Sequence, residues 1–190
     1  MKNPATASQT AGPYVHLGLT EHDSVACLAG KDAQGERIRI RCSILDGDGQ
    51  PVRDAVIELW QANSSGKYRH PEDLQDKPTD SAFLGFGRLA VGEDGTCTFE
   101  TIKPGCVAGP GTSLQAPHIN VSIFARGLLK QLATRIYFAG DPNNDKDPVL
   151  EIVPEARRHT LLAQPTPSRP THWEFAIQLC SENETVFFDV

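Results

Sequence analysis

The sequence predicts an all-β protein, a sandwich or barrel with long irregular loops and little helix. Short segments alternate apolar and polar side chains, and turn residues separate these segments at short intervals. Only one stretch, residues 150–162, has the character of a short helix. Alternation with a period of two gives each strand one core face and one outer face. Such strands bury their apolar faces when two layers pack on each other or one sheet closes.

Composition and charge predict a single domain that binds neither nucleic acid nor a membrane. The 190 residues can bury one sizeable core, and 18 basic against 24 acidic residues give a net charge of −6. No basic run favours nucleic acid, and no apolar run has membrane-spanning length. The first residues lack a signal-peptide core, and the five cysteines form no Cys-x-x-Cys motif. We therefore expect a cytoplasmic protein with reduced thiols.

Residues 1–36 are predicted to form an N-terminal arm, and residues 37–190 a β-sandwich domain. The arm shows no strong periodicity of apolar side chains. Within it, Pro13 fixes a bend and biases Gly12 toward an extended or turn conformation. Taken alone, this pattern is typical of a flexible leader that packs one aromatic residue, Tyr14, on the domain.

Strands begin where the alternation begins. In residues 37–44, isoleucine and cysteine alternate with arginine and serine, which predicts the first strand. The Asp-Gly-Asp-Gly sequence at 46–49 predicts a hairpin turn, and residues 56–60 form a second strand. Residues 61–87 form a polar loop whose length is more often functional than not.

The second half continues the same pattern. Residues 88–91 and 96–101 flank a Glu-Asp-Gly turn and predict a hairpin. Residues 104–117 are rich in glycine and proline and are therefore irregular. The remaining predictions are strands at 118–124, 134–138, 173–179 and 185–190, a short helix within 150–162, and a loop at 164–170, which contains three prolines.

The strand at residues 118–124 carries the side chains of chemical interest. His118, Asn120 and Ser122 fall on one side, and the apolar residues between them face the core. A His-x-His at this place would put two imidazoles about one pleat apart, close enough to share a metal ion. Here the second position is an asparagine, and the function depends on what that difference means.

Several segments together resemble the intradiol ring-cleaving dioxygenases, from about Ser8 to the C-terminus. Each segment alone is a weak match, but their shared order and spacing make the resemblance strong. The matching segments are Ser8–Tyr14, Glu58–Asn63, Gly66–His70, Thr101–Gly105, Ala116–Asn120, Arg135–Phe138 and Glu184–Asp189. The resemblance implies a β-sandwich of the intradiol dioxygenase type.

Catalytic chains of that family hold a non-haem ferric ion with two tyrosinates and two histidines, and the metal activates a catechol toward O2. By this resemblance, Tyr68 and His118 match the first tyrosine and the first histidine. Val107 and Asn120 stand where the second pair would be, and Gln115 replaces an arginine. Valine has no donor atom, and an amide oxygen is a poor substitute for imidazole on ferric iron. We expect these five residues to form a vestigial pocket without a metal, in which the tyrosine and histidine are hydrogen-bonded remnants.

The resemblance further implies a subunit without catalytic residues or a cofactor of its own, paired with a homologous beta subunit that holds Fe(III). The assembly would cleave protocatechuate with O2 between its two hydroxylated carbons, giving 3-carboxy-cis,cis-muconate. The arm would pack on the partner chain and carry Gly12, Pro13 and Tyr14 toward the substrate, because a flat Gly-Pro wall suits a flat ring. Arg135 would approach the same pocket and favour an anionic substrate.

Other interpretations remain open. The chain could be a stand-alone intradiol dioxygenase with an altered metal site, or a non-enzymatic β-sandwich that binds or scaffolds other proteins. Taken alone, Arg135 also fits a surface or ion-paired arginine. Trp60 and Trp173 are predicted to lie in the core or at an interface.

Overall fold

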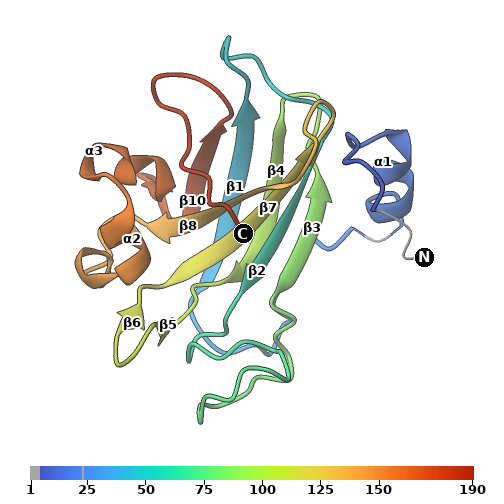
Figure 1. Cartoon of the computed structure of the whole chain (residues 1–190). Helices are drawn as coiled ribbons and strands as arrows, with labels where there is room; N and C mark the ends of the chain where they lie inside the picture. Colours follow the sequence, from blue (N-terminus) through green and yellow to red (C-terminus); the bar gives the residue numbers. More distant parts are fainter. Residues whose placement is uncertain (1–4, 23) are drawn as a thin grey trace.

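A computed structural model describes residues 5–22 and 24–190, which fold into strands with a few short helices (Figure 1). None of the helices in these two ranges is long and apolar enough to cross a membrane. In chain order the elements are α1 (Pro13–Leu19), β1 (Arg37–Leu45), β2 (Ala55–Gln61), β3 (Phe86–Ala90), β4 (Thr96–Ile102), β5 (Val107–Ala108), β6 (Leu114–Gln115), β7 (His118–Ala125), β8 (Leu132–Phe138), η1 (Asn144–Lys146), α2 (Pro148–Ile152), α3 (Glu155–Arg158), η2 (His159–Leu161), β9 (Leu162–Thr166) and β10 (Arg169–Gln178).

Eight strands form one continuous sheet in the order β3-β2-β7-β8-β9-β10-β1-β4, and β5 pairs only with β6. The sheet turns back on itself at β9, which pairs with β8 on one side and β10 on the other. The two resulting layers pack face to face, and buried side chains from both fill the space between them. The prediction of an all-β sandwich with little helix is confirmed.

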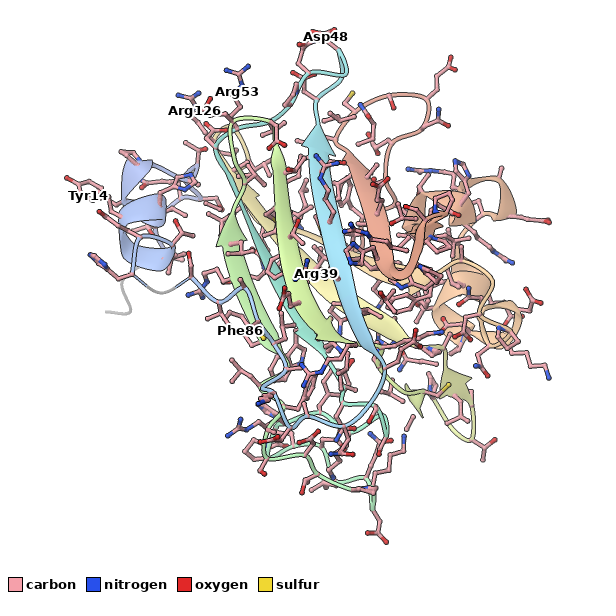
Figure 2. All side chains as sticks on the ribbon, turned by 180° about the vertical axis from the view of Figure 1, so that it is seen from behind. Tyr14, Arg39, Asp48, Arg53, Phe86 and Arg126 are labelled. Carbon is pink, nitrogen blue, oxygen red and sulfur yellow. The ribbon has the colours of Figure 1, made fainter. Side chains whose placement is uncertain are left out.

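β1 shows why the alternating pattern forms this architecture. Ile38, Ile40 and Ile44 are buried in the core, while the arginines between them are exposed on the outer face, as Figure 2 shows for Arg39. β1 lies between β10, its parallel neighbour, and β4, its antiparallel neighbour. A one-residue shift in register would turn the isoleucines toward water, so the core fixes the pairing.

A short segment of the N-terminal arm bridges the two edge strands, β3 and β4. Val25 exchanges two backbone hydrogen bonds with Arg88 of β3, at 2.8 and 3.0 Å. Three residues later, the Leu28 N–H donates to the Glu100 carbonyl of β4 at 2.9 Å. The Leu28 side chain is fully buried, and a Cβ at Gly87 would lie 2.5 Å from its Cδ1 atom, so any larger residue at position 87 would displace Leu28. Residues 25–28 therefore complete the sandwich.

The hairpin predicted at residues 88–101 is wrong, although both of its strands exist. β3 pairs with β2, whereas β4 pairs with β1, so the chain crosses between the two layers at this turn. The turn itself is held by the Gly92 N–H, which donates to the Thr96 carbonyl at 2.8 Å. The strands do not pair directly because residues 25–28 occupy the place between them.

The turn predicted at 46–49 is formed, with the Asp46 N–H donating to the Gln50 carbonyl at 2.9 Å, and Asp48 lies at its tip in Figure 2. It does not lead into a full hairpin. A single bridge joins Leu45 to Pro51, and the chain then enters β2 in the other layer.

The C-terminal third corrects two predicted elements. Residues 164–170 are not a loop, because β9 and β10 extend into them. Pro165 is tolerated in β9 because β8 pairs with β9 only at residues 162 and 163, so the absent N–H breaks no ladder on that side. The strand predicted at 185–190 is reduced to one bridge, in which the Phe188 N–H donates to the Ala133 carbonyl at 2.8 Å.

The helices also differ from the prediction. The helix expected within residues 150–162 is divided into α2, α3 and the 3-10 turn η2, and Pro154 separates the first two because it cannot continue a helix. The helix α1 was not predicted, and it lies within the N-terminal arm. Pro13 occupies its first turn, where a missing N–H costs nothing, and Gly12 before it is extended, at φ −103° and ψ −178°.

Candidate functional site

The strand register builds a pocket of about 570 Å³ on the outer face of the layer that contains β2, β7 and β8. Pairing places Trp60, Asn120 and Arg135 in one row across these three strands. His118 pairs with Tyr137 in the next row, on the same face. The loop between β2 and β3, at the bottom of Figure 1, and the small β5–β6 hairpin form the walls.

The loop between β2 and β3 brings Tyr68 onto this face. The Tyr68 N–H donates to Oδ2 of Asp73 at 2.7 Å, and the Lys67 ammonium lies 3.6 Å from Oδ1 of the same carboxylate. Lys67 also donates to the Asp73 carbonyl oxygen at 2.7 Å. The Tyr68 ring then stacks on Trp60, with ring centroids 5.8 Å apart and an interplanar angle of 18°. The long loop is therefore an ordered support for Tyr68.

Tyr68, His118 and Asn120 are hydrogen-bonded to one another. The Asn120 amide nitrogen donates to the Tyr68 phenol oxygen at 3.1 Å, and that oxygen lies 3.4 Å from Nε2 of His118. Because Nδ1 of His118 lies 2.8 Å from the Ala116 carbonyl oxygen, Nδ1 carries the ring proton. Nε2 is then free to accept from Tyr68. The predicted remnants of the pocket satisfy each other in this way.

Burial keeps both the histidine and the tyrosine uncharged. Burial lowers the pKa of His118 to about 4, and the positive charge of Arg135 acts in the same direction. Burial also raises the pKa of Tyr68, and this outweighs the hydrogen bond from Asn120 and the charge of Arg135, which lower it. At neutral pH the pocket therefore presents a phenol and a neutral imidazole.

Arg135 joins the two remaining sides of the pocket. Its Nη1 atom donates to Oε1 of Gln115 at 2.7 Å and to the Tyr137 hydroxyl at 3.3 Å. The Tyr137 hydroxyl donates to Asp147, a buried carboxylate that also accepts the Ala116 N–H at 2.7 Å. Gln115, which stands where the family resemblance implied an arginine, therefore accepts a hydrogen bond from Arg135 of β8.

The donor set does not fit a ferric ion. Val107, on β5, presents only an apolar side chain to the pocket, and Asn120 directs its nitrogen at Tyr68. Tyr68 and His118 are neutral and bonded to each other, whereas a trivalent cation requires several anionic or strongly basic donors. Across residues 5–22 and 24–190, no three His, Cys, Asp or Glu side chains form a group that could hold a metal.

The arm residues lie elsewhere. Gly12 and Pro13 border a separate cavity of about 320 Å³ with Asp54 and Arg126. Tyr14 is 82% exposed, and Figure 2 shows its side chain pointing away from the sheet. The structure therefore brings the vestigial pocket residues together with Arg135 and leaves the arm residues outside this pocket.

Three residues of the site were missed or misplaced by sequence reasoning. Trp60 was predicted to lie in the core or at an interface, but it lines the pocket. Trp60 lies two residues after the polar Glu58 and therefore on the same face of β2, and this spacing was the available signal. Tyr137 and Asp147 support the pocket through hydrogen bonds. Tyr137 lies in the matching segment Arg135–Phe138 but was given no role, and nothing local in the sequence distinguishes Asp147. Trp173 is indeed in the core, edge-on to a phenylalanine.

Comparison with known proteins places this geometry in a family. Residues 10–180 match the protein family described as Dioxygenase (Dioxygenase_C). The chain is 41% identical over 199 residues to the protocatechuate 3,4-dioxygenase alpha chain of Pseudomonas putida, covering 98% of this chain and 96% of that one. It is 38% identical over 151 residues to the beta chain of the Burkholderia cepacia enzyme, covering 78% and 64%. The 3-chlorocatechol 1,2-dioxygenase of Rhodococcus opacus 1CP has the same fold, with a TM-score of 0.66 at 22% identity, covering 92% of this chain and 71% of that one. This chain belongs to the family of intradiol ring-cleavage dioxygenases.

Proposed function

We propose that this chain is the alpha subunit of a protocatechuate 3,4-dioxygenase and that it acts only together with a homologous, iron-bearing beta subunit. Similarity to an alpha chain over almost the full length of both proteins supports this, as does the shorter match to a beta chain. The observation that carries the proposal is the altered donor set. Val107 and Asn120 replace two ligands, and the remaining tyrosine and histidine bond to each other instead of to a metal.

In this proposal, the assembled enzyme cleaves protocatechuate with O2 between its two hydroxylated carbons, and Fe(III) belongs to the partner. This chain contributes part of the wall of the substrate pocket through Gly12, Pro13 and Tyr14. The place of α1 supports this role, because Figure 1 shows it standing apart from the sheet beside β3. No α1 residue is buried in the chain itself, so the helix has a free surface to offer a partner.

Arg135 is the second residue proposed to act on the substrate side. Its guanidinium lines the vestigial pocket, and it also borders a depression of about 350 Å³ between β7, β8 and the C-terminal segment. In the assembled enzyme, Arg135→Ala should lower turnover while leaving the partner's iron content and visible spectrum unchanged. Turnover equal to that of the unmodified enzyme would remove Arg135 from the substrate side.

Co-expression with a beta-type chain tests the proposal as a whole. The two chains should co-purify, with iron in proportion to the beta chain, and this chain purified alone should contain no iron and show no tyrosinate-to-iron absorption. Stoichiometric iron and catechol cleavage by the chain alone would instead establish a stand-alone dioxygenase. Failure to co-purify would favour a scaffold or binding protein.

A further inference from the structure

Two cysteines face each other across the neighbouring strands β1 and β4. Cys42 of β1 lies directly opposite Cys97 of β4 in the antiparallel register. Opposite residues of an antiparallel pair point to the same face of the sheet, and here both side chains are buried in the core between the two layers. Both are free thiols in the structure. No step of the proposed function uses either sulfur.

The hydrogen bonds beside this pair define how far apart the two backbones are. Two residues along β1 from Cys42, the Ile44 N–H donates to the Gly95 carbonyl at 3.0 Å. Because hydrogen-bonded and non-hydrogen-bonded pairs alternate along antiparallel strands, Cys42 and Cys97 also form a hydrogen-bonded pair, with Cα atoms about 5.5 Å apart. Disulfides join residues whose Cα atoms are about 4.4–6.8 Å apart, so the two cysteines are within reach of one.

A disulfide at this place would be strained and therefore easy to reduce. In a hydrogen-bonded pair the Cβ atoms lie near the upper end of the range of about 4.5–5.5 Å, whereas a disulfide prefers about 3.8 Å. Strain raises the reduction potential of a disulfide, and strained bonds are typically the reversible ones rather than the structural ones. The register thus favours a bond that forms under oxidising conditions and opens again when thiols are abundant.

The two thiols differ in how an oxidant can reach them. Cys42 is fully buried, and a hydrogen bond to the Cys97 side chain, together with burial, raises the pKa of its thiol. Cys97 is 8% exposed and is the second residue of β4, the last strand in the order of the sheet. Strand ends open more readily than strand centres. An oxidant therefore reaches Cys97 first, and Cys42 lies in place to complete the bond.

We infer that Cys42 and Cys97 form a site of reversible modification, at which a low-molecular-weight disulfide such as glutathione disulfide converts the two thiols into one intramolecular disulfide. The Cys97 thiolate attacks the reagent, which gives a mixed disulfide and releases one glutathione thiolate. Cys42 loses its proton to solvent, and its sulfur then attacks the Cys97 sulfur and releases the second glutathione thiolate. The two protons lost by the protein end on these thiolates, so two cysteines are oxidised while one disulfide is reduced.

This inference goes beyond the proposed function and does not depend on it. β1 and β4 belong to the layer that contains β9 and β10, and neither strand contributes a residue to the vestigial pocket. Where thiols are normally kept reduced, disulfides are usually transient, and a strained bond between neighbouring strands has this character.

Disulfide mapping of the full-length chain tests the inference. The reduced, folded protein is incubated with glutathione disulfide, its remaining thiols are blocked with N-ethylmaleimide, and the unreduced peptides are identified by mass spectrometry. We expect the peptide that joins Cys42 to Cys97 to be at least tenfold more abundant than any other pairing of the five cysteines. An excess of reduced glutathione should then return both thiols.

The same oxidation in urea is the control for proximity in the sequence. Short loops of an unfolded chain close more readily than long ones. The denatured chain should therefore pair Cys97 with the nearby Cys106 more often than with Cys42. A preference for Cys42 that appears only in the folded protein is the result expected from the strand register.

Two variants separate the roles of the thiols, and a third is a matched control. Cys42→Ala should leave Cys97 as a lasting mixed disulfide with glutathione, whereas Cys97→Ala should leave Cys42 as a free thiol, because it is fully buried. Cys27→Ala removes an exposed thiol of the N-terminal arm and should leave formation of the bond unchanged. Unfolding midpoints show that each variant is folded, and either of the first two variants suffices if the other is not.

Recovery of Cys42 and Cys97 as free thiols, while the exposed Cys27 and Cys180 carry glutathione, would overturn the inference. So would another pairing of equal abundance in the folded protein. A Cys42–Cys97 bond that resists reduced glutathione would show a permanent cross-link and would overturn the reversible site.

Discussion

The Asn120 amide nitrogen donates to the Tyr68 oxygen, which in turn donates to His118. Each donation uses an electron pair that a metal ligand would have to offer the ion. An asparagine at position 120 thereby removes the lone pairs with which Tyr68 and His118 could bind a metal. The three polar groups therefore use each other as hydrogen-bond partners in a half-buried pocket, as buried polar groups generally must.

The buried histidine should make the chain less stable in mild acid. His118 has a pKa of about 4 in the folded protein, below its ordinary value of 6.5, so the unfolded chain binds more protons between these values. The contribution of His118 to the free energy of unfolding should be fully present above pH 6.5. It should fall by about 3 kcal/mol as the pH drops to 4.

Urea unfolding at about pH 7, 5.5 and 4.5 measures this effect. His118→Gln, which cannot titrate, should show a shallower dependence of stability on pH than the unmodified chain. Parallel curves for the two proteins would show that the ring is not held neutral. The difference between the two proteins isolates His118 from carboxylates that titrate in the same window.

The sequence alone predicted some of the residues of the site and missed others. Tyr68, Val107 and His118 were recognised because they lie in short motifs whose spacing survives in the chain. Tyr137 and Asp147 reach the site through strand pairing and a helix cap, which join residues distant in sequence. Such partners are defined only once the strand register is known.

The helix α2 is linked by hydrogen bonds to the segment just before the strand that carries His118. Asp147 caps α2 by accepting the Val149 and Leu150 N–H groups at 2.8 and 2.9 Å, and its other oxygen accepts the Ala116 N–H at 2.7 Å. The Ala116 carbonyl then orients the His118 ring. A short helix outside the sandwich is thereby coupled to the pocket.

Removing that cap should destabilise the protein strongly. Asp147 is 1% exposed, so Asp147→Ala leaves several buried donors without an acceptor and should cost about 3 kcal/mol. Asp147→Asn, which retains one acceptor oxygen, should cost less. Asp145→Ala, at an exposed position two residues earlier, is the control and should change stability little. Equal urea midpoints for Asp147→Ala and Asp145→Ala would contradict the role of the cap.

Sequence periodicity recovered the elements whose two faces differ in polarity. β1 and β7 were predicted because isoleucines alternate with polar residues, and the core then requires that orientation. It failed where long-range pairing overrides local chemistry. Residues 164–170 form strands despite their prolines because β9 and β10 pair with each other there. Residues 88–101 do not form a hairpin because a distant segment lies between the two strands.

The sandwich as a whole depends on that distant segment. Residues 25–28 hydrogen-bond to β3 on one side and to β4 on the other, where the sheet would otherwise leave two open edges. Exposed edges invite pairing with other chains, so this contact protects the molecule as well as completing its core.

Truncating the buried leucine of this segment should weaken both edges together. Leu28 is fully buried, and Leu28→Ala should lower the free energy of unfolding by about 3 kcal/mol. Hydrogen exchange should also accelerate in β3 and β4 before it does in β7. Leu17→Ala, on α1 where the side chain is 53% exposed, should change stability by less than about 0.5 kcal/mol. Similar losses for the two variants would show that the segment is not part of the core.

The parallel pairing of β1 with β10 has a consequence for how the protein is made. β1 is the first strand that the structure describes, yet one of its two neighbours is the last. During synthesis the backbone hydrogen-bonding groups on this edge of β1 therefore stay unpaired until residue 178 has emerged. Folding should therefore be late and slow for a chain of this size, with an unpaired strand edge exposed during synthesis.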